Sequence, residues 1–308
     1  MAVSSTSAGI FHQLYYLYMA IALVVGALVL GWLAYSLIKF RARPGVERPR
    51  DAPRAGVLPA ERGHPLWSYV MALVIAGIMF GLAFGTISAV HTLEEPPHEG
   101  ERVMANVTGF QFGWRFTQYG EGGVPIAKVT DWTIPVDTPI VADVQSKDVW
   151  HNFAIPDFRI RIDVIPGQVN HIWWEAHETG EVLPVCVQIC GVGHALMHTN
   201  MHVVTKDEWK AYVADESAKE YAKLEKAGQV VNVTYDGATF ATETKTLAEG
   251  KPFAYRLTNA GAEATSFVVD GSAGTTAHDH PGLVTIAPGA AAYLFASHAD
   301  AQLQAVIE

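Results

Sequence analysis

The chain has 308 residues, of which 50% are hydrophobic and only 17% charged, and its formal net charge is −10. This composition is apolar for a soluble protein and predicts membrane-embedded segments. The negative charge argues against binding to nucleic acid, because the phosphate backbone would be repelled.

Two long stretches carry no charged side chain, Leu14 to Ile38 and Pro65 to Val90. As a helix, each is long enough to cross a hydrocarbon core of about 30 Å. A buried core helix is the alternative, but such helices rarely have more than about 20 unbroken apolar residues. A cleavable signal peptide fits the first stretch poorly, since no basic residue precedes it. We therefore predict two transmembrane helices.

The segment between the two stretches is basic and predicts the orientation of the helices. It holds seven basic and three acidic residues, the basic ones being Lys39, Arg41, Arg43, Arg48, Arg50, Arg54 and Arg62. The positive-inside rule places this loop in the cytoplasm, so both termini and everything after the second helix lie outside. Residues 92–308 have a net charge of −14. That charge would attract a basic or neutral partner, or would simply keep the domain soluble.

From Arg102 onward the pattern changes to short runs of alternating polarity separated by turn residues. Such runs predict an antiparallel β domain. Residues 206–226 have helical periodicity among many charges and predict an amphipathic surface helix that ends at Gly228. Further strand-like runs follow, in enough chain for a second small β domain. We expect a hairpin at 1–95, a β domain at 96–227 and a smaller one at 228–308.

The only two cysteines, Cys186 and Cys190, lie in the stretch "CVQICGVGHALM". A disulfide between them would close a very small ring and stabilise little. Zinc would accept two thiolates and His194, but it would not select the thioether of Met197. Thiolate, imidazole and a weakly bound thioether together are typical of copper.

The spacing of the cysteines also allows their sulfurs to bridge two metal ions. A binuclear site needs a second imidazole from another strand, and His151 in "DVWHNFAIPDF" is the best candidate. It lies at the end of a predicted strand and a proline turn follows, an arrangement that resembles the way in which cupredoxin folds present their upstream histidine.

The pattern C-x-[EQ]-x-C-G-x-x-H-x-x-M, with "DVWHNFAIP" upstream, resembles the CuA motif of subunit II of haem–copper oxidases. The segment "RIDVIPGQVN" is similar to a strand turn of the same family. The resemblance covers roughly residues 14–215 and includes the two helices and the basic loop. It implies that the exterior β domain has a cupredoxin-like fold.

The resemblance also implies a set of copper ligands. Cys186 and Cys190 would bridge two coppers, His151 and His194 would each bind one, and Met197 and the carbonyl of Gln188 would be weak ligands. The subunit would take electrons from an exterior carrier, a cytochrome c or a blue-copper protein. It would pass them to haem in the catalytic subunit I, where oxygen is reduced to water and protons are pumped. The expected location is the plasma membrane of a prokaryote.

Four positions depart from the family pattern. Gln168, in "RIDVIPGQVN", stands in place of the usual arginine. Gln188 stands where many relatives have a glutamate, whose side chain binds magnesium in the family. An amide is a weaker ligand for this ion, which leaves magnesium in doubt. Phe112 stands where the family has the tryptophan that receives the electron, and Gly113 stands where a tyrosine is usual. Trp114 remains, so we expect electron uptake near Phe112 and Trp114.

The last segment resembles a cupredoxin more weakly and lacks the usual copper ligands, although it contains His278, His280 and His298. We expect it to be a copper-free packing or docking domain. Alternatives for the whole chain are the CuA subunit of a nitric oxide reductase and a membrane-anchored copper-delivery protein. A delivery protein of thioredoxin fold would carry its histidine far downstream of the cysteines. A quinol oxidase subunit is disfavoured, because those relatives lack the cysteines.

Overall fold

The computed structural model describes residues 3–41, 45, 64–97, 101–244, 246–248, 251–270, 284–296 and 302–306. It contains two compact units, of which one comprises residues 9–95 and the other residues 1–8 together with 96–308. Most of the predicted basic loop lies outside the described residues, and so do His278, His280 and His298.

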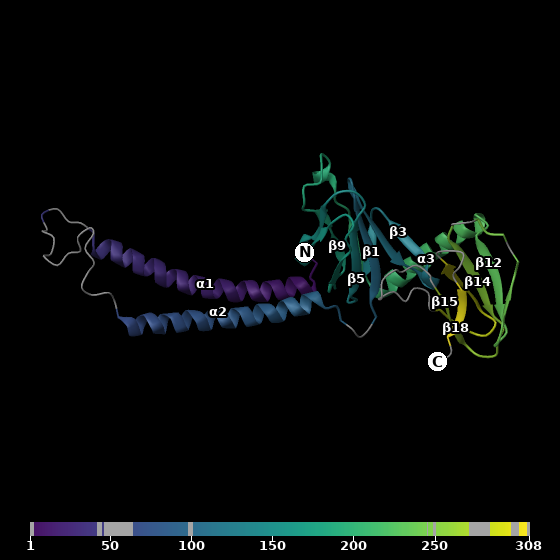
Figure 1. Cartoon of the computed structure of the whole chain (residues 1–308), viewed down its shortest axis with the longest axis horizontal. Helices are drawn as coiled ribbons and strands as arrows, with labels where there is room; N and C mark the ends of the chain where they lie inside the picture. The colour runs from purple at the N-terminus through teal and green to yellow at the C-terminus, as the bar shows by residue number, and fades with distance from the viewer. Residues whose placement is uncertain are drawn as a thin grey trace. The chain divides into compact units, whose positions relative to one another are not determined.

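The first unit is a pair of helices, α1 (Thr6–Lys39) and α2 (Pro65–Glu94) (Figure 1). Pro65 begins α2, where the missing backbone N–H of proline costs nothing. Both helices are long and apolar enough to cross a membrane, and their most apolar windows are not buried within the described part of the chain. The Tyr18 hydroxyl lies 2.5 Å from Thr86 Oγ1 and joins the two helices. The predicted pair of long apolar helices is confirmed, and it fits a membrane anchor.

In the second unit, residues 103–204 form three sheets, whose strands are joined by loops and short 3₁₀ turns. A five-stranded sheet has the order β3-β2-β1-β5-β8, and two three-stranded sheets have the orders β10-β6-β7 and β4-β11-β9. The strands are β1 (Val103–Phe110), β2 (Gly113–Tyr119), β3 (Pro125–Lys128), β4 (Trp132–Pro135), β5 (Ile140–Ser146), β6 (His151–Ile155), β7 (Ile160–Val164), β8 (Asn170–Trp174), β9 (Gly180–Val182), β10 (Val185–Cys186) and β11 (Met201–Val204). The predicted β domain is thus confirmed, although β1 pairs with β5, and β4 with β11, in parallel.

The core between these sheets is aromatic. The side chains of β1 alternate between buried and half-buried, as expected of a strand with one face on a core. The rings of Phe116 and Trp132 stack with centroids 4.5 Å apart, and Trp174 meets Trp132 edge-on at 5.8 Å. Cys186, Cys190 and Met197 belong to the same buried cluster. These three predicted metal ligands are therefore packed into the buried core of the unit.

Residues 3–8 pack on this β region. Ser5 forms an isolated antiparallel bridge with Ala176, and Ser7 Oγ donates a hydrogen bond of 2.7 Å to the carbonyl of Phe158. Ser5 and Ser7 are both buried.

The predicted surface helix is confirmed as α3 (Lys206–Lys226). Thr205 caps its first turn, because its hydroxyl accepts from the Glu208 backbone N–H while the Glu208 carboxylate accepts from the backbone N–H of Thr205. The Tyr221 ring stacks on Tyr293 at 4.7 Å, and its hydroxyl donates to the carbonyl of Glu121 at 2.7 Å. Tyr221 thus contacts residues that lie before and after α3 in the chain.

After α3 come a four-stranded sheet, β13-β12-β14-β17, and a three-stranded sheet, β16-β15-β18. The strands are β12 (Val230–Tyr235), β13 (Phe240–Thr242), β14 (Phe253–Asn259), β15 (Thr265–Asp270), β16 (Val284–Ile286), β17 (Ala291–Ala296) and β18 (Gln302–Val306). They enclose a separate apolar cluster that includes Leu257, Phe267 and Leu294. An additional β region therefore follows the first.

Candidate metal centre

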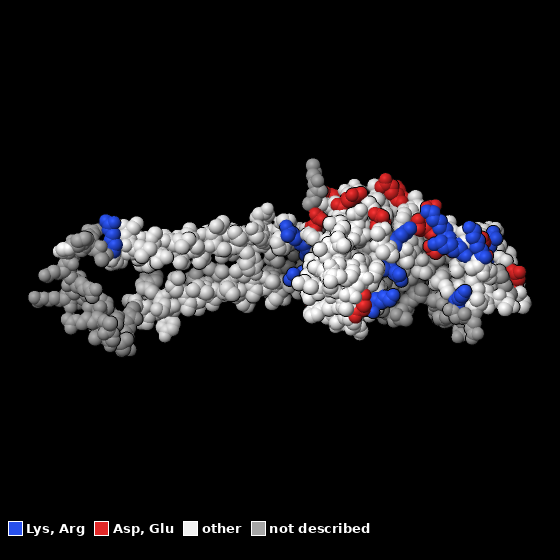
Figure 2. All heavy atoms as spheres, turned by 90° about the horizontal axis from the view of Figure 1, so that it is seen from above, with Lys and Arg blue, Asp and Glu red and all other residues white. Residues whose placement is uncertain are grey.

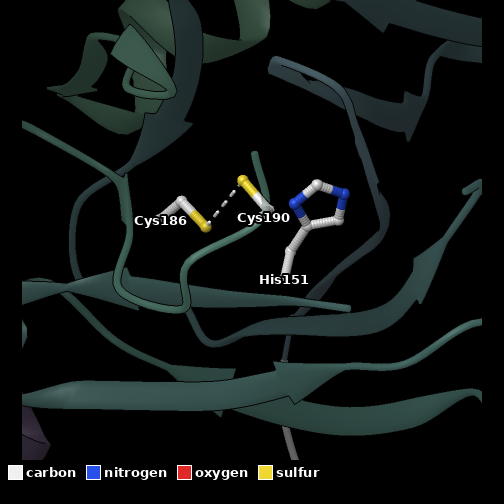
Figure 3. Close-up of side chains that lie close together, drawn as sticks. All are labelled: His151, Cys186 and Cys190. Carbon is white, nitrogen blue, oxygen red and sulfur yellow. Dashed lines mark hydrogen bonds between the residues drawn. The ribbon is translucent and has the colours of Figure 1, made fainter. Parts of the chain in front are cut away.

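The two cysteines approach each other at the end of a short strand. Cys186 ends β10 and pairs with Phe153 of β6, whereas Cys190 lies in the following loop. Their Sγ atoms are 4.0 Å apart, and both thiols are free and buried. His151, the first residue of β6, is fully buried beside them. Its ring and the two thiols lie together, with their ligand atoms within 4.8 Å of one another (Figure 3).

The remaining predicted ligands surround the same sulfurs. Cys186 Sγ is 3.2 Å from the carbonyl oxygen of Gln188. Cys190 Sγ is 3.6 Å from His194 Nδ1 and 3.8 Å from Met197 Sδ. The structure thus brings all six predicted ligand residues together. Their binding of a metal remains a prediction.

Two glycines let the loop pass close to Phe112. A Cβ atom on Gly193 would lie 2.5 Å from the Phe112 ring, and one on Gly191 would lie 2.9 Å from it. Gly191 also has a φ of +143°, which side chains rarely adopt. Gln111 Nε2 donates to the carbonyl of Cys190 at 2.6 Å. Gln111 and Phe112 therefore support the loop that carries Cys190 and His194.

Asp148 is a site residue that the sequence did not predict. Its carboxylate lies 2.8 Å from His151 Nε2 and accepts hydrogen bonds from the backbone N–H groups of Gln111 and Val149. Burial disfavours the charged carboxylate, but the hydrogen bonds from His151 and from these N–H groups outweigh it and lower the pKa of Asp148. An ionised Asp148 requires the proton on Nε2 of neutral His151, which leaves a lone pair on Nδ1. A carboxylate three residues before a histidine is too common a pattern to have indicated this role.

The second nitrogen of His151 is available to a ligand. Nδ1 is buried and has no hydrogen-bond partner among the described residues. A buried polar atom without a hydrogen-bond partner costs free energy of folding. A nitrogen with a free lone pair that faces two thiols is suited to bind a metal ion together with them. Two thiols, two imidazoles, a thioether and a carbonyl are a donor set that copper prefers. The residues present therefore fit the copper site expected from the sequence.

The thiol of Cys190 is not a reactive nucleophile. The pKa of Cys190 is raised to about 11, mainly because the thiol is buried and secondly because Cys186 lies beside it. The thiol is therefore protonated at neutral pH, and a metal ion must displace the proton to bind.

The two residues expected to take up electrons occupy different environments. Trp114 is 1% exposed, and its ring centroid is 6.0 Å from that of His151. Phe112 is half-buried against the aromatic core. Of the two, only Phe112 is accessible to another protein.

Comparison with known proteins indicates the family of the chain. The family "Cytochrome C oxidase subunit II, periplasmic domain" matches residues 121–204. The "Heme-copper oxidase subunit 2" of Aeropyrum pernix is 35% identical over 205 residues, which are 65% of this chain and 87% of that protein. The "Cytochrome c oxidase subunit 2" of Alkalihalophilus pseudofirmus is 29% identical over 184 residues, and the matched part spans 59% of this chain and 52% of that protein.

A solved structure, the periplasmic domain of subunit II of cytochrome oxidase from Bradyrhizobium japonicum, is also similar. It is 28% identical, covers 39% of this chain and 97% of its own, and has a TM-score of 0.36. Because the match to the Aeropyrum pernix protein covers most of that protein at 35% identity, the two chains belong to one family. The chain belongs to the family of subunit 2 of the haem–copper oxidases, which are components of an oxidoreductase complex.

Proposed function

We propose that this chain is the electron-accepting subunit of a terminal haem–copper oxidase and that it holds a binuclear copper centre. His151, Cys186, Cys190 and His194 would be the strong ligands, and Met197 and the carbonyl of Gln188 the weak ones. When bound, such a centre supplies reversible transfer of one electron. The observation that carries the proposal is the buried, unpartnered His151 Nδ1 facing two free thiols.

The residues around the site favour electron transfer over bond chemistry. Cys186, Cys190, Met197 and His151 are buried in an aromatic core, so the ligands can move little when the charge of the site changes. The protein would therefore fix the ligand positions and exclude water, while oxygen reduction and proton pumping would belong to the catalytic subunit.

The proposed setting follows from the same assignment. The helices α1 and α2 would cross the plasma membrane, with the β regions outside. Electrons would come from an exterior carrier and leave for haem in the catalytic subunit. We also propose that residues 228–308 form a separate copper-free domain, which is supported by their own apolar cluster around Leu257, Phe267 and Leu294.

Electron paramagnetic resonance of the full-length, copper-loaded chain in detergent tests the centre. One unpaired electron shared by two equivalent coppers would give a seven-line pattern, with two coppers per chain by elemental analysis. A four-line signal, or a Cys186–Cys190 disulfide in the native protein, would contradict the proposal. Consumption of nitric oxide instead of oxygen by the purified complex would overturn the assignment to a terminal oxidase.

Asp148→Asn is expected to weaken copper binding by about 10- to 100-fold, because the carboxylate fixes the ring of His151 and leaves Nδ1 free. Competition with a copper chelator measures the affinity. Asp163→Asn provides a matched control, since Asp163 is exposed on β7 and its carboxylate accepts a hydrogen bond from the side chain of Asn152. An equal loss of affinity in both variants would mean that Asp148 does not act through His151.

A further inference from the structure

The loop that carries Cys190 and His194 ends in an exposed apolar surface. Val192 is fully exposed, Ile189 is 82% exposed and Leu196 is 74% exposed. We call these three residues the apolar tip. Exposed large aliphatic side chains this close together are unusual on a soluble surface and indicate a contact with another molecule.

The apolar tip has almost no charge around it. Residues 183–204 contain no Lys, Arg, Asp or Glu, and neither do residues 111–114. The carboxylate of Asp148 lies nearby but accepts hydrogen bonds from Gln111, Val149 and His151. The loop lies at the top of the first β region in Figure 1 and faces the viewer in Figure 2, where a broad area of this region carries neither blue nor red atoms. The charge of residues 92–308 is therefore located elsewhere.

The apolar tip is also directly connected to the candidate metal centre. Val192 is two residues from Cys190 and two from His194. The Phe112 ring lies against Gly191 and Gly193 on either side of Val192, and Gln111 holds the carbonyl of Cys190. A molecule seated on Val192 would contact the ligand loop directly, whereas the buried Trp114 cannot be touched from outside.

We propose that the apolar tip, with Phe112, is the surface on which the exterior electron carrier docks, and that the contact face of this carrier is apolar and uncharged. This inference rests on the proposed function. An apolar contact stabilises the complex by removing water from both faces and needs no complementary charge. The carrier that fits is a small blue-copper protein or another carrier with an apolar rim, and not a cytochrome c that binds through a ring of lysines.

Stopped-flow reduction of the assembled oxidase at low and high salt tests the inference, with a small blue-copper protein of apolar contact face and a lysine-rich cytochrome c as the two carriers. The second-order rate constant with the blue-copper protein should change less than about twofold between about 0.05 and 0.5 M salt, because screening acts only on charged contacts. The cytochrome should react more slowly. A rate that is higher with the cytochrome and falls steeply with salt would overturn the inference.

Val192→Asp should lower the rate with the blue-copper protein at least about tenfold, because an unpaired charge would have to be buried. Val129→Asp is the matched control, since Val129 is 47% exposed in the turn after β3, and it should leave the rate unchanged. The seven-line spectrum and the copper content should be normal in both variants, which separates docking from the proposed function. If Val192→Asp leaves the rate unchanged, or prevents assembly of the oxidase, the apolar tip is not the carrier site; loss of assembly would identify it as a contact with the catalytic subunit.

Discussion

Cys190→Ser is expected to bind no binuclear copper and to lower electron input into the oxidase by at least about a thousandfold. Cys190 Sγ lies at the centre of the predicted ligands, close to Cys186 Sγ, His194 Nδ1 and Met197 Sδ. A serine hydroxyl is a poor replacement, because copper selects soft sulfur ligands and an alcohol does not ionise as a thiol does. Copper content, the seven-line spectrum and the rate of reduction by an exterior carrier measure the effect.

Met197→Leu is the informative comparison for Cys190→Ser. Met197 is 1% exposed, and leucine fills a similar volume, so folding should be little affected. Because a thioether is expected to be only a weak ligand, this variant should keep both coppers while the reduction potential and the spectrum change. If Met197→Leu lost copper as completely as Cys190→Ser, the distinction between strong and weak ligands would be wrong. If Cys190→Ser kept two coppers, the site would lie elsewhere.

Trp132→Ala is expected to destabilise the β region by about 3–5 kcal/mol, the range found for buried Trp→Ala and Phe→Ala substitutions. Trp132 is 1% exposed, stacks on Phe116 and donates to Gln118 Oε1 at 3.0 Å. Its removal leaves a cavity and an unsatisfied buried amide. Since the net stability of a domain is only about 5–15 kcal/mol, this is a large part of the total.

Urea unfolding of the metal-free full chain in detergent, followed by tryptophan fluorescence, measures this change. Trp150→Ala supplies the control, because Trp150 is 49% exposed and its loss should change the free energy of unfolding by about 0.5 kcal/mol or less. If the two variants were equally stable, the aromatic cluster would not be the main source of stability for the strands that carry the site.

The local elements could be predicted because their signals are contiguous in sequence. The uncharged stretches predicted α1 and α2, and the charged periodic segment predicted α3, whose capping box of Thr205 and Glu208 fixes its start. Five of the six predicted ligand residues lie within the twelve residues 186–197, so their proximity needs no knowledge of the fold. His151 was placed beside them only through the family resemblance, and the pairing of Cys186 with Phe153 shows why it lies there.

The features that were missed depend on contacts distant in sequence. The parallel pairing of β1 with β5 cannot be derived from the alternation of either strand. The role of Asp148 depends on the backbone of Gln111, 37 residues away, and on the buried face of His151. The short strand β13 has too little alternation to be distinguished from a loop.

The packing of residues 3–8 on the β region has a consequence for how the protein is made. The hydroxyl of Ser7 bonds to a carbonyl 151 residues later, and Ser5 pairs with Ala176. These residues leave the ribosome long before their partners exist, and closing so large a loop is slow. Residues 3–8, which include the start of α1, should therefore be secured late in biogenesis. A bulky tag placed there would delay maturation more than one fused beyond β18.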